Sequence, residues 1–349
     1  MINQQLHNPQ FNTVGTLVQW MAAVQGQEYA QTKWGLVLRL PVLDDSDIER
    51  DFAAGKILRT HLLRPTWHIV SAKDIRWLLH LTAPRVHQAN AFMYRKLELT
   101  DTVFEKCQSI ITTILQGGKQ LTRNDINAAF KENKIIAAGH RLSYIMMHAE
   151  LDGLVCSGAR NGNQFTYALL EDRVRREKDL DRDEALAELT KRYFSSRGPA
   201  TVNDFATRSG LTLTDCRSGI EMNKRRLKEK AIAGVNYFFL DSDSKATARH
   251  GGIYLLPIYD ELIMGYKNRD ALLEFKRENK QTSGFQYDSM IVCEGQIIGT
   301  WRRVFDSKSI EISAQFFQPL TPRQSQAFDD AVNQFGKFTG IKVRYSPPN

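Results

Sequence analysis

Residues 121–169 contain the succession of signals that most restricts the fold of this chain: two short helices followed by a glycine-rich hairpin. Thr122 is a helix N-cap with Asp125 at the third helical position, which predicts that a helix starts there. A second helix is predicted over 139–152, and a hairpin with a polar tip over 154–169. Two helices and a hairpin in this order are typical of a winged helix, whose second helix can lie in the major groove of DNA.

The same order recurs further along the chain. Helices are predicted over 184–195, 202–209 and 213–223, and strands over 227–240. Lys224, Arg225 and Arg226 follow the last of these helices, which takes the place of a recognition helix. These cations either contact DNA phosphates or form a solvated helix end, which the helix dipole also favours.

The two ends of the chain have a different pattern. An amphipathic helix is predicted from Thr13 to Val24, and a strand in the second half of 58–70. Further helices are predicted near 47–54 and from about Asp74 through Leu81. From about residue 251 strand-like segments alternate with turns, and a closing helix is predicted over 328–338. We therefore expect four units: 1–110, 111–172, 173–245 and a β-rich domain at 246–349.

Charge and cysteine usage restrict the class of partner and compartment. The formal net charge is +8 and the sequence pI about 9.2, which favours a polyanionic partner, with a merely basic protein as the alternative. The four cysteines lie far apart, so we expect no zinc knuckle or redox pair. The N-terminus lacks the pattern of a signal peptide and no apolar run is long enough to cross a membrane. We expect a cytoplasmic protein without a membrane span, a metal or a cofactor.

A pair of glutamines stands out near the N-terminus. Gln25 and Gln27 flank Gly26 directly after a short apolar segment. Amides do not ionise, but their donors and acceptors can hold a water or the edge of a base. Such a pair predicts a site that orients its ligand and does not titrate.

Six sets of residues occur in order from near residue 20 to beyond residue 300. They are Val24–Gln27 with Trp34–Leu36, Arg64–Val70, Leu154–Gly158, Tyr193–Ala206, Leu256–Glu261 with Gly265–Lys267, and Gly299–Arg303. As an ordered set that covers most of the chain, they resemble the winged helix DNA-binding family that contains the AlkZ and AlkX (YcaQ) DNA glycosylases. The resemblance implies an α+β fold of tandem winged-helix (helix-turn-helix) domains with a C-terminal β-barrel-like domain, forming a concave DNA-binding surface.

The resemblance also implies a catalytic pair. The family motif is a glutamine, any residue, then glutamine or aspartate, and Gln25 and Gln27 match it. Gly26 departs from the larger apolar residue that is usual between them. Pro65 departs from the glycine that often precedes the threonine of the family's second motif.

We predict DNA contacts at eight further positions, most of them with a structural alternative. Thr66 and His68 lie two residues apart, so on a strand both side chains point to one face, where a half-buried structural histidine is the alternative. For the segment around Trp301 the alternative is a core tryptophan next to solvated arginines. The predicted contacts are Thr66, His68, Arg160, Lys224, Arg225, Arg226, Trp301 and Arg302.

Three carboxylates near these segments have structural interpretations. Glu28 follows the glutamine pair and is interpreted as an exposed helix-end residue, with a hidden general base as the alternative. Asp260 and Glu261 are interpreted as a cap or salt-bridge pair, with an acid pair as the alternative. None of the common nucleotide-binding, metalloprotease or serine-hydrolase motifs is present in the sequence.

Three functions remain open from the sequence. The leading hypothesis is a monofunctional glycosylase that excises cationic N-alkylated purines with a water held by Gln25 and Gln27, and the sequence leaves open whether it also unhooks interstrand crosslinks. The second is a non-catalytic winged-helix DNA-binding protein or transcription regulator. The third is a protein-interaction scaffold. Several winged helices in one chain favour a monomer that wraps alkylated double-stranded DNA over a dimer that reads half-sites.

Overall fold

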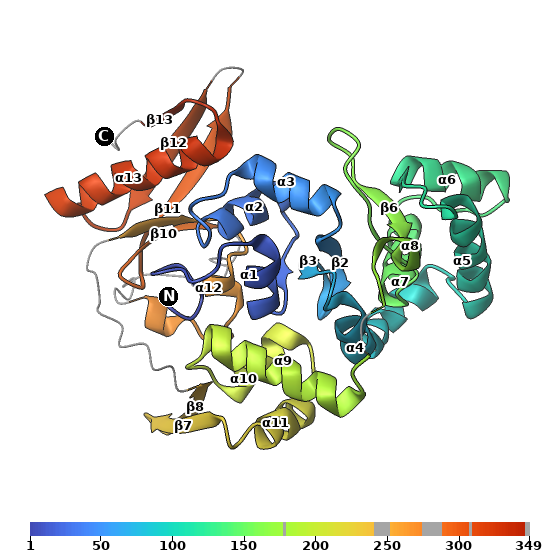
Figure 1. Ribbon diagram of the computed structural model, residues 1–349, viewed down its shortest axis with the longest axis horizontal. Helices are drawn as coiled ribbons and strands as arrows, with labels where there is room; N and C mark the ends of the chain where they lie inside the picture. Colours follow the sequence, from blue (N-terminus) through green and yellow to red (C-terminus); the bar gives the residue numbers. More distant parts are fainter. Residues whose placement is uncertain (177–178, 241–251, 274–287, 307–308, 346–349) are drawn as a thin grey trace.

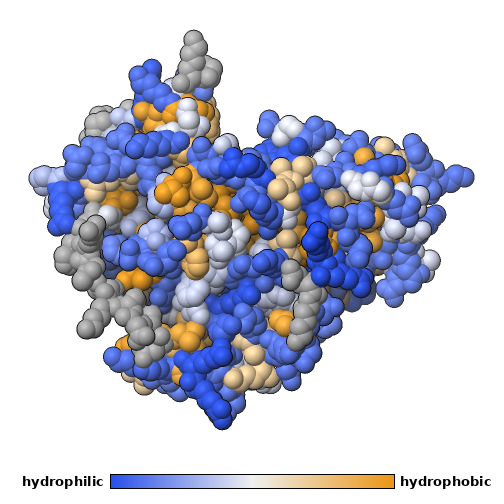
Figure 2. All heavy atoms as spheres, viewed as in Figure 1, coloured by the Kyte–Doolittle hydropathy of each residue, from blue (hydrophilic) through white to orange (hydrophobic). Residues whose placement is uncertain are grey.

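The computed structural model describes residues 1–349 apart from 177–178, 241–251, 274–287, 307–308 and 346–349. Within these residues the chain forms four β-sheets surrounded by helices, an α+β architecture (Figure 1). No described helix has the length and apolar character needed to cross a membrane. Hydrophilic residues cover most of the face shown in Figure 2, and apolar ones gather toward the middle of the molecule.

The N-terminal part folds around a small three-stranded sheet of order β1-β3-β2. Its elements are α1 (Val14–Trp20), β1 (Val24–Gln25), α2 (Tyr29–Val37), α3 (Asp45–Ala53), β2 (Ile57–Leu62) and β3 (Arg64–Ser71). The strands β2 and β3 form an antiparallel hairpin whose turn passes through Leu63 at φ 62°. The helix α4 (Ile75–Lys96) then leads away to a separate lobe on the right of Figure 1.

That lobe contains the first predicted helix–helix–hairpin unit. It comprises α5 (Asp101–Leu115), β4 (Leu121–Thr122), α6 (Arg123–Glu132), α7 (His140–Leu151), β5 (Val155–Ser157), β6 (Thr166–Leu169) and α8 (Leu170–Arg173). Thr122 and Asp125 form a reciprocal capping box at the start of α6, as predicted. The strands pair in the order β4-β6-β5, so β4, which directly precedes α6, joins the sheet of the β5–β6 hairpin.

The second predicted unit lies below the N-terminal sheet in Figure 1. It comprises α9 (Arg182–Arg197), α10 (Val202–Ser209), α11 (Leu213–Met222), β7 (Leu227–Ile232) and β8 (Val235–Leu240). Capping boxes start all three helices, and Gly210 ends α10 in the left-handed conformation at φ 71°. The predicted boundaries are therefore confirmed to within a few residues here.

The C-terminal part is a five-stranded curled sheet, a half barrel, with a long helix packed on it. Its elements are β9 (Ile253–Leu256), α12 (Glu261–Met264), the short 3₁₀ helix η1 (Asp270–Leu272), β10 (Ser289–Cys293), β11 (Gln296–Phe305), β12 (Ile310–Phe316), α13 (Pro322–Thr339) and β13 (Val343–Tyr345). All neighbours pair antiparallel except β12 and β13, which run parallel.

Three larger hydrophobic cores hold these parts together. One joins the N-terminal helices to the C-terminal sheet and α13, so that Trp34 packs against Phe335 and donates its indole N–H to the carbonyl of Leu255 at 2.6 Å. A second joins the β2–β3 hairpin and α4 to the helices α9–α11. The third fills the lobe of α5–α7. The four sequence ranges remain a prediction, and the boundary between residues 245 and 246 lies outside the described residues.

Two predicted helices have different lengths in the structure. The helix expected from Thr13 to Val24 ends at Trp20, because Ala22 takes a positive φ of 60° and the next residues enter β1. The helix expected to end at Leu81 continues to Lys96 through an internal proline, Pro84. The chain leaves α1 early because β1 pairs with the distant strand β3, and the helical periodicity of the sequence carries no information about this pairing.

Candidate active site

The first glutamine of the pair ends β1, an edge strand of the N-terminal sheet. Gln25 is opposite His68 of β3 in antiparallel register and is only 4% exposed. Gln27 follows the strand and is half-buried. The pair is therefore held by a sheet and not by a helix end.

Gln25 is fixed through its backbone and its side chain. Its N–H donates to Oε1 of Glu261 at 2.8 Å, and its carbonyl accepts from Oγ1 of Thr32 at 3.0 Å. Its side-chain Oε1 accepts from Nη2 of Arg64 at 2.8 Å. Because a guanidinium only donates, this contact defines which end of the amide is the oxygen. Among the described residues the Nε2 of Gln25 has no partner, so an N–H donor remains for a ligand.

Gly26 and Gln27 are held by hydrogen bonds to the backbone of Trp67 in β3 and to the Arg59 side chain of β2. The N–H of Gly26 donates to the carbonyl of Trp67 at 2.7 Å, and its carbonyl accepts from Nε of Arg59 at 2.8 Å. The Oε1 of Gln27 accepts from the Trp67 N–H at 3.4 Å, a weak bond. A Cβ at Gly26 would lie 3.2 Å from the backbone of His68, closer than most real contacts. A glycine therefore lets this segment approach β3 closely, and its own bonds keep the segment in place.

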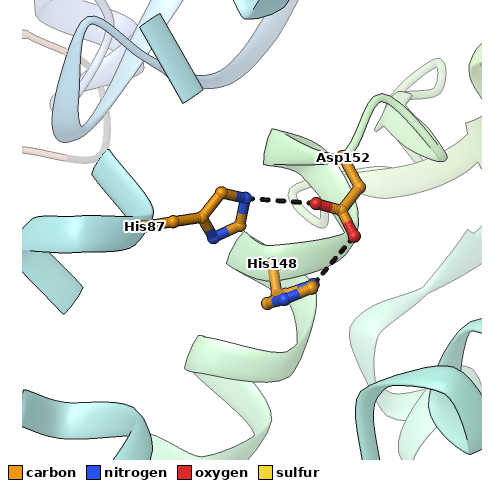
Figure 3. Close-up of side chains that lie close together, drawn as sticks. All are labelled: His87, His148 and Asp152. Atoms are coloured by element: carbon orange, nitrogen blue, oxygen red, sulfur yellow. Dashed lines mark hydrogen bonds and ion pairs between the residues drawn. The ribbon is translucent and has the colours of Figure 1, made fainter. Parts of the chain in front are cut away.

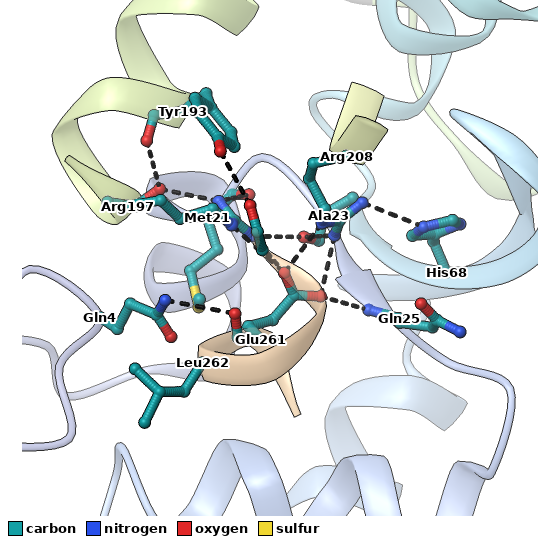
Figure 4. Close-up of polar contacts among 12 residues, drawn as sticks. Gln4, Met21, Ala23, Gln25, His68, Tyr193, Arg197, Arg208, Glu261 and Leu262 are labelled. Atoms are coloured by element: carbon teal, nitrogen blue, oxygen red, sulfur yellow. Dashed lines mark hydrogen bonds and ion pairs between the residues drawn. The ribbon is translucent and has the colours of Figure 1, made fainter. Parts of the chain in front are cut away.

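A buried ion triad lies directly behind Gln25 (Figure 4). The Glu261 carboxylate accepts from Nη2 of Arg197 at 2.6 Å and from Nη2 of Arg208 at 2.8 Å, and all three side chains are 3% exposed or less. Burial opposes ionisation of Glu261, but the charges of Arg208 and Arg197 outweigh it and hold the pKa of the carboxyl well below its usual range. The triad therefore carries a net positive charge next to the site.

His68 belongs to the same network and not to the surface. Its Nε2 lies 3.2 Å from Nη1 of Arg208, so this nitrogen accepts, and the Nδ1–H donates to the carbonyl of Thr66 at 3.0 Å. Burial and the charge of Arg208 lower the pKa of His68 well below its ordinary value, which keeps the imidazole neutral. The predicted contact of His68 with DNA is corrected accordingly, because the ring is fully buried and both nitrogens are engaged.

The start of β3 presents unpaired polar groups beside Gln25. The Nε of Arg64 and the Oγ1 of Thr66 are buried and lack a partner within the described part of the chain. Burial and the nearby Arg208 lower the pKa of Arg64 to about 10, which still leaves it charged at neutral pH. Arg64 begins the Arg64–Val70 motif, but the sequence alone predicts no role for it. Only its contact with Gln25 reveals that role.

The comparison with known protein families matches most of the chain. A family model described as DNA glycosylase AlkZ-like matches residues 18–338. The chain belongs to this family. It is an AlkZ-like DNA glycosylase, a hydrolase of N-glycosidic bonds, and the resemblance inferred from the ordered segments is confirmed. Membership also decides against the non-catalytic DNA-binding protein and the scaffold.

Two comparisons with individual proteins agree with this assignment. The glycosylase is 23% identical over 300 residues to an interstrand DNA cross-link repair glycosylase of Streptomyces sahachiroi, covering 81% of this chain and 80% of the relative. The solved structure of Streptomyces sahachiroi DNA glycosylase AlkZ matches with a TM-score of 0.78 and 20% identity, covering 99% of this chain and 97% of that one. At this identity the structural likeness establishes the shared α+β fold.

The predicted DNA-contacting cations of the glycosylase lie on three different parts of the fold. Arg160 lies in the β5–β6 loop, pairs with Glu49 at 3.0 Å and stacks over Phe165, so it is half-buried. Lys224, Arg225 and Arg226 are exposed in the turn between α11 and β7, where Lys224 pairs with the neighbouring Glu221. Arg302 is exposed on β11.

The prediction that Trp301 contacts DNA is wrong. Its side chain is 2% exposed, its Nε1–H donates to the carbonyl of Leu256 at 2.8 Å, and its ring packs against Phe335. A bound duplex does not reach a ring in this position. The core-tryptophan alternative is the one that the structure supports.

The carboxylates follow the structural interpretations. Asp260 pairs with the buried Arg39 at 2.8 Å and caps α12 through the N–H of Leu262, and Glu261 anchors Gln25. Glu28 is exposed at the N-cap of α2 and makes no side-chain cap bond. The interpretation as caps and salt bridges is thus confirmed for Asp260 and Glu261.

Proposed function

We propose that this glycosylase excises cationic N-alkylated purines from double-stranded DNA, using a water held by the amides of Gln25 and Gln27. The observation that carries the proposal is the contrast between Gln25 and the carboxylate behind it. Gln25 has a fixed amide with an N–H free for a ligand, whereas Glu261 is saturated by Arg197, Arg208 and the Gln25 N–H. A carboxylate held in this way is not a general base, because accepting a proton would cost it both ion pairs.

Amides suffice because an alkylated purine is already a good leaving group. Hydrolysis breaks the bond between the deoxyribose C1′ and the base nitrogen, and the electron pair of that bond neutralises the cationic base. The water oxygen bonds to C1′ and releases its proton to solvent. Charge develops on the sugar as an oxocarbenium-like centre. Orienting the water then supplies the main catalytic advantage, which is worth several kcal/mol when the geometry is right.

The cation of Arg64 has a specific place in this proposal. A positive charge beside a positive transition state is unfavourable by itself. The unpaired Nε of Arg64 and hydroxyl of Thr66 are suited to a DNA phosphate, which would neutralise that charge. Thr66 therefore remains a proposed DNA contact, and Arg64 joins it.

The fold supports a DNA-binding role for the two helix–helix–hairpin units. Each places two helices before a hairpin, which is the order of a winged helix, and we propose that they act as tandem winged helices. The C-terminal half barrel is the candidate for the β-barrel-like domain. Arg160, Arg302 and the exposed cations at 224–226 would contact phosphates, so affinity should fall steeply with salt.

Interstrand crosslinks are a second proposed substrate of the same site. The relative from Streptomyces sahachiroi is named as an interstrand cross-link repair glycosylase. A crosslink made through two alkylated purine nitrogens has the same leaving group at each end, so the same hydrolysis would release one strand from the other. We also propose that the enzyme acts as a monomer in the cytoplasm.

The proposal is tested with duplex DNA that carries N7-methylguanine. Under single-turnover conditions the wild type should release free base, and Gln25→Ala and Gln27→Ala should each lower the rate by ~100-fold while still binding DNA. Glu28→Gln is the matched control, because it removes the nearest carboxylate in sequence and leaves both amides. Neutral lesions should be poor substrates.

Two results would overturn the proposal. Loss of base release in Glu28→Gln with full activity in Gln25→Ala would assign catalysis to a carboxylate. Equal release of neutral and cationic bases would show that the enzyme activates the leaving group itself. Sedimentation of the protein with and without DNA tests the monomer.

A further inference from the structure

A compact group of metal-ligand side chains lies at the junction of α4 and α7, outside the glutamine site. His87 of α4 faces Asp152 at the end of α7, with Nε2 and Oδ1 3.1 Å apart. His148, one turn before Asp152, places its Nδ1 3.0 Å from Oδ2. One ligand atom from each of the three residues lies within 4.8 Å of the others (Figure 3). Nothing in the sequence spacing indicates this, because His87 and Asp152 are 65 residues apart.

Each of the three donors is oriented by a further partner. The Nδ1 of His87 contacts the Tyr94 hydroxyl at 3.0 Å, the ring of His148 stacks on Phe104 with centroids 3.6 Å apart, and Gln108 donates to the Asp152 carboxylate. Metal-ligating histidines characteristically have a partner on the other ring nitrogen, and Tyr94 supplies it for His87. The donors are thus held in place before any ion binds.

The spacing also suits a tetrahedral ion. In a zinc site with ligands about 2.0–2.1 Å from the metal, neighbouring ligand atoms lie about 3.3 Å apart. The histidine–aspartate distances are 3.1 Å to Oδ1 and 3.0 Å to Oδ2, and one ligand atom of each residue lies within 4.8 Å of the others, so binding through a single carboxylate oxygen draws the two histidines closer together. A surface groove of about 370 Å³ opens beside His87 and Asp152, which leaves room for a water as the fourth ligand.

We propose that His87, His148 and Asp152 bind one divalent transition-metal ion of the zinc class. On binding, the His87 proton moves from Nε2 to Nδ1, where it is donated to the Tyr94 oxygen, and His148 carries its proton on Nε2. The ion then joins α4 to α7 next to the small apolar contact of these helices, formed by Ala83, Val86, Met147 and Leu151. Because α4 connects the glutamine site to the lobe of α5–α7, the ion fixes the lobe relative to the site.

The test is metal binding by the untagged full-length protein after removal of bound metal with a chelator. Titration with Zn²⁺ should show one tight equivalent, and Co²⁺ should give the visible absorption of a tetrahedral complex. Zn²⁺ should also raise the Tm, since it binds the folded state. His87→Ala and Asp152→Asn should each weaken the affinity at least ~10-fold and abolish the Tm rise.

His80→Ala provides the matched control. His80 lines the same groove on α4 but is not one of the three clustered donors, so its loss should change neither affinity nor Tm rise. The conservative Asp152→Asn variant keeps the proposal testable if His87→Ala does not fold, which circular dichroism will show. Absence of a stoichiometric Zn²⁺ site, or equal binding by wild type and Asp152→Asn, would overturn the proposal.

Discussion

At the scale of single residues, Arg64 determines how Gln25 presents its amide. The guanidinium donates to the side-chain oxygen at 2.8 Å, which directs the amide nitrogen away from Arg64. Without that donor the terminal torsion of a glutamine is broad, and two opposite orientations become similar in energy. Arg64 is therefore a positioning residue for the proposed water.

We predict that Arg64→Met slows base release roughly 10- to 100-fold at saturating enzyme. The change keeps the apolar stem but removes a hydrogen bond from a charged donor, which is typically worth about 1.5–3 kcal/mol. Single-turnover release of N7-methylguanine measures the chemical step apart from affinity. Arg225→Met is the control and should weaken only binding. An unchanged single-turnover rate in Arg64→Met would exclude the positioning role.

The sequence indicates the role of some site residues and not of others, and the difference is how far apart their contacts lie along the chain. Gln25, Gln27 and Thr66 lie in short motifs that a sequence displays directly. The contact of Gln25 with Glu261 spans 236 residues, and no periodicity or spacing encodes such a pairing. For the same reason the sequence left two alternatives for Trp301, a DNA contact or a core residue, and only the structure decides between them.

At the scale of elements, the turn between β2 and β3 depends on the end of α10. Gly210 has a φ of 71°, and a Cβ built there would lie 2.1 Å from the carbonyl oxygen of Leu63. Leu63 directly precedes Arg64, so α10 packs against the turn that positions this cation. A side chain at Gly210 must displace the turn.

We predict that Gly210→Ala destabilises the protein by more than Gly340→Ala and also slows base release. Gly340 is the matched control, because it ends α13 at φ 65° with nothing within 4 Å of a Cβ. The control therefore measures only the cost of the left-handed backbone, about 1–2 kcal/mol. Urea unfolding and single-turnover release should separate the two variants. Equal losses of stability, with equal rates, would show that the contact with Leu63 is unimportant.

Helix starts were predictable at this scale and helix ends less so. Capping residues such as Thr122 and Asp125 act within one turn, so the sequence records them locally. The early end of α1 follows from strand pairing with β3, and α4 continues through Pro84 because its packing against α7 and α9 outweighs one missing backbone bond. Tertiary contacts decide both cases.

At the scale of the whole molecule, the Glu261 triad joins three distant segments. Glu261 follows β9, Arg197 ends α9 and Arg208 lies in α10, and both arginines also donate to the carbonyl of Ala23 before β1. One buried carboxylate therefore connects the N-terminal sheet, the second helix–helix–hairpin unit and the C-terminal part. We therefore expect loss of the Glu261 carboxylate to destabilise all three parts.

We predict that Glu261→Gln lowers the free energy of unfolding by about 3–5 kcal/mol at pH 7, because two buried guanidiniums lose their counter-charge. The folded-state pKa of Glu261 is depressed, whereas an unfolded glutamate titrates near 4.3. The unfolded state thus binds the proton first, and this stabilisation is present at neutral pH and lost as the pH falls below about 4. The difference between wild type and variant should shrink over that range.

Urea unfolding at several pH values measures this difference. Glu105→Gln, on the exposed side of α5, is the control and should change stability by less than about 0.5 kcal/mol at every pH. A Glu261→Gln deficit that stays constant down to pH 3 would show that packing, and not charge, accounts for its effect.

The shared core of the two chain ends has a consequence for how the enzyme is made. Translation proceeds from the N-terminus at about 5–20 residues per second, so Gln25 emerges from the ribosome on the order of 10–50 s before its anchor, Glu261. During that interval β1 lacks both the carboxylate and the C-terminal sheet against which its neighbours pack. A nascent or prematurely terminated chain therefore displays winged-helix-like units without an assembled glutamine site. An activity that cuts bases from the genome becomes available only in the finished molecule.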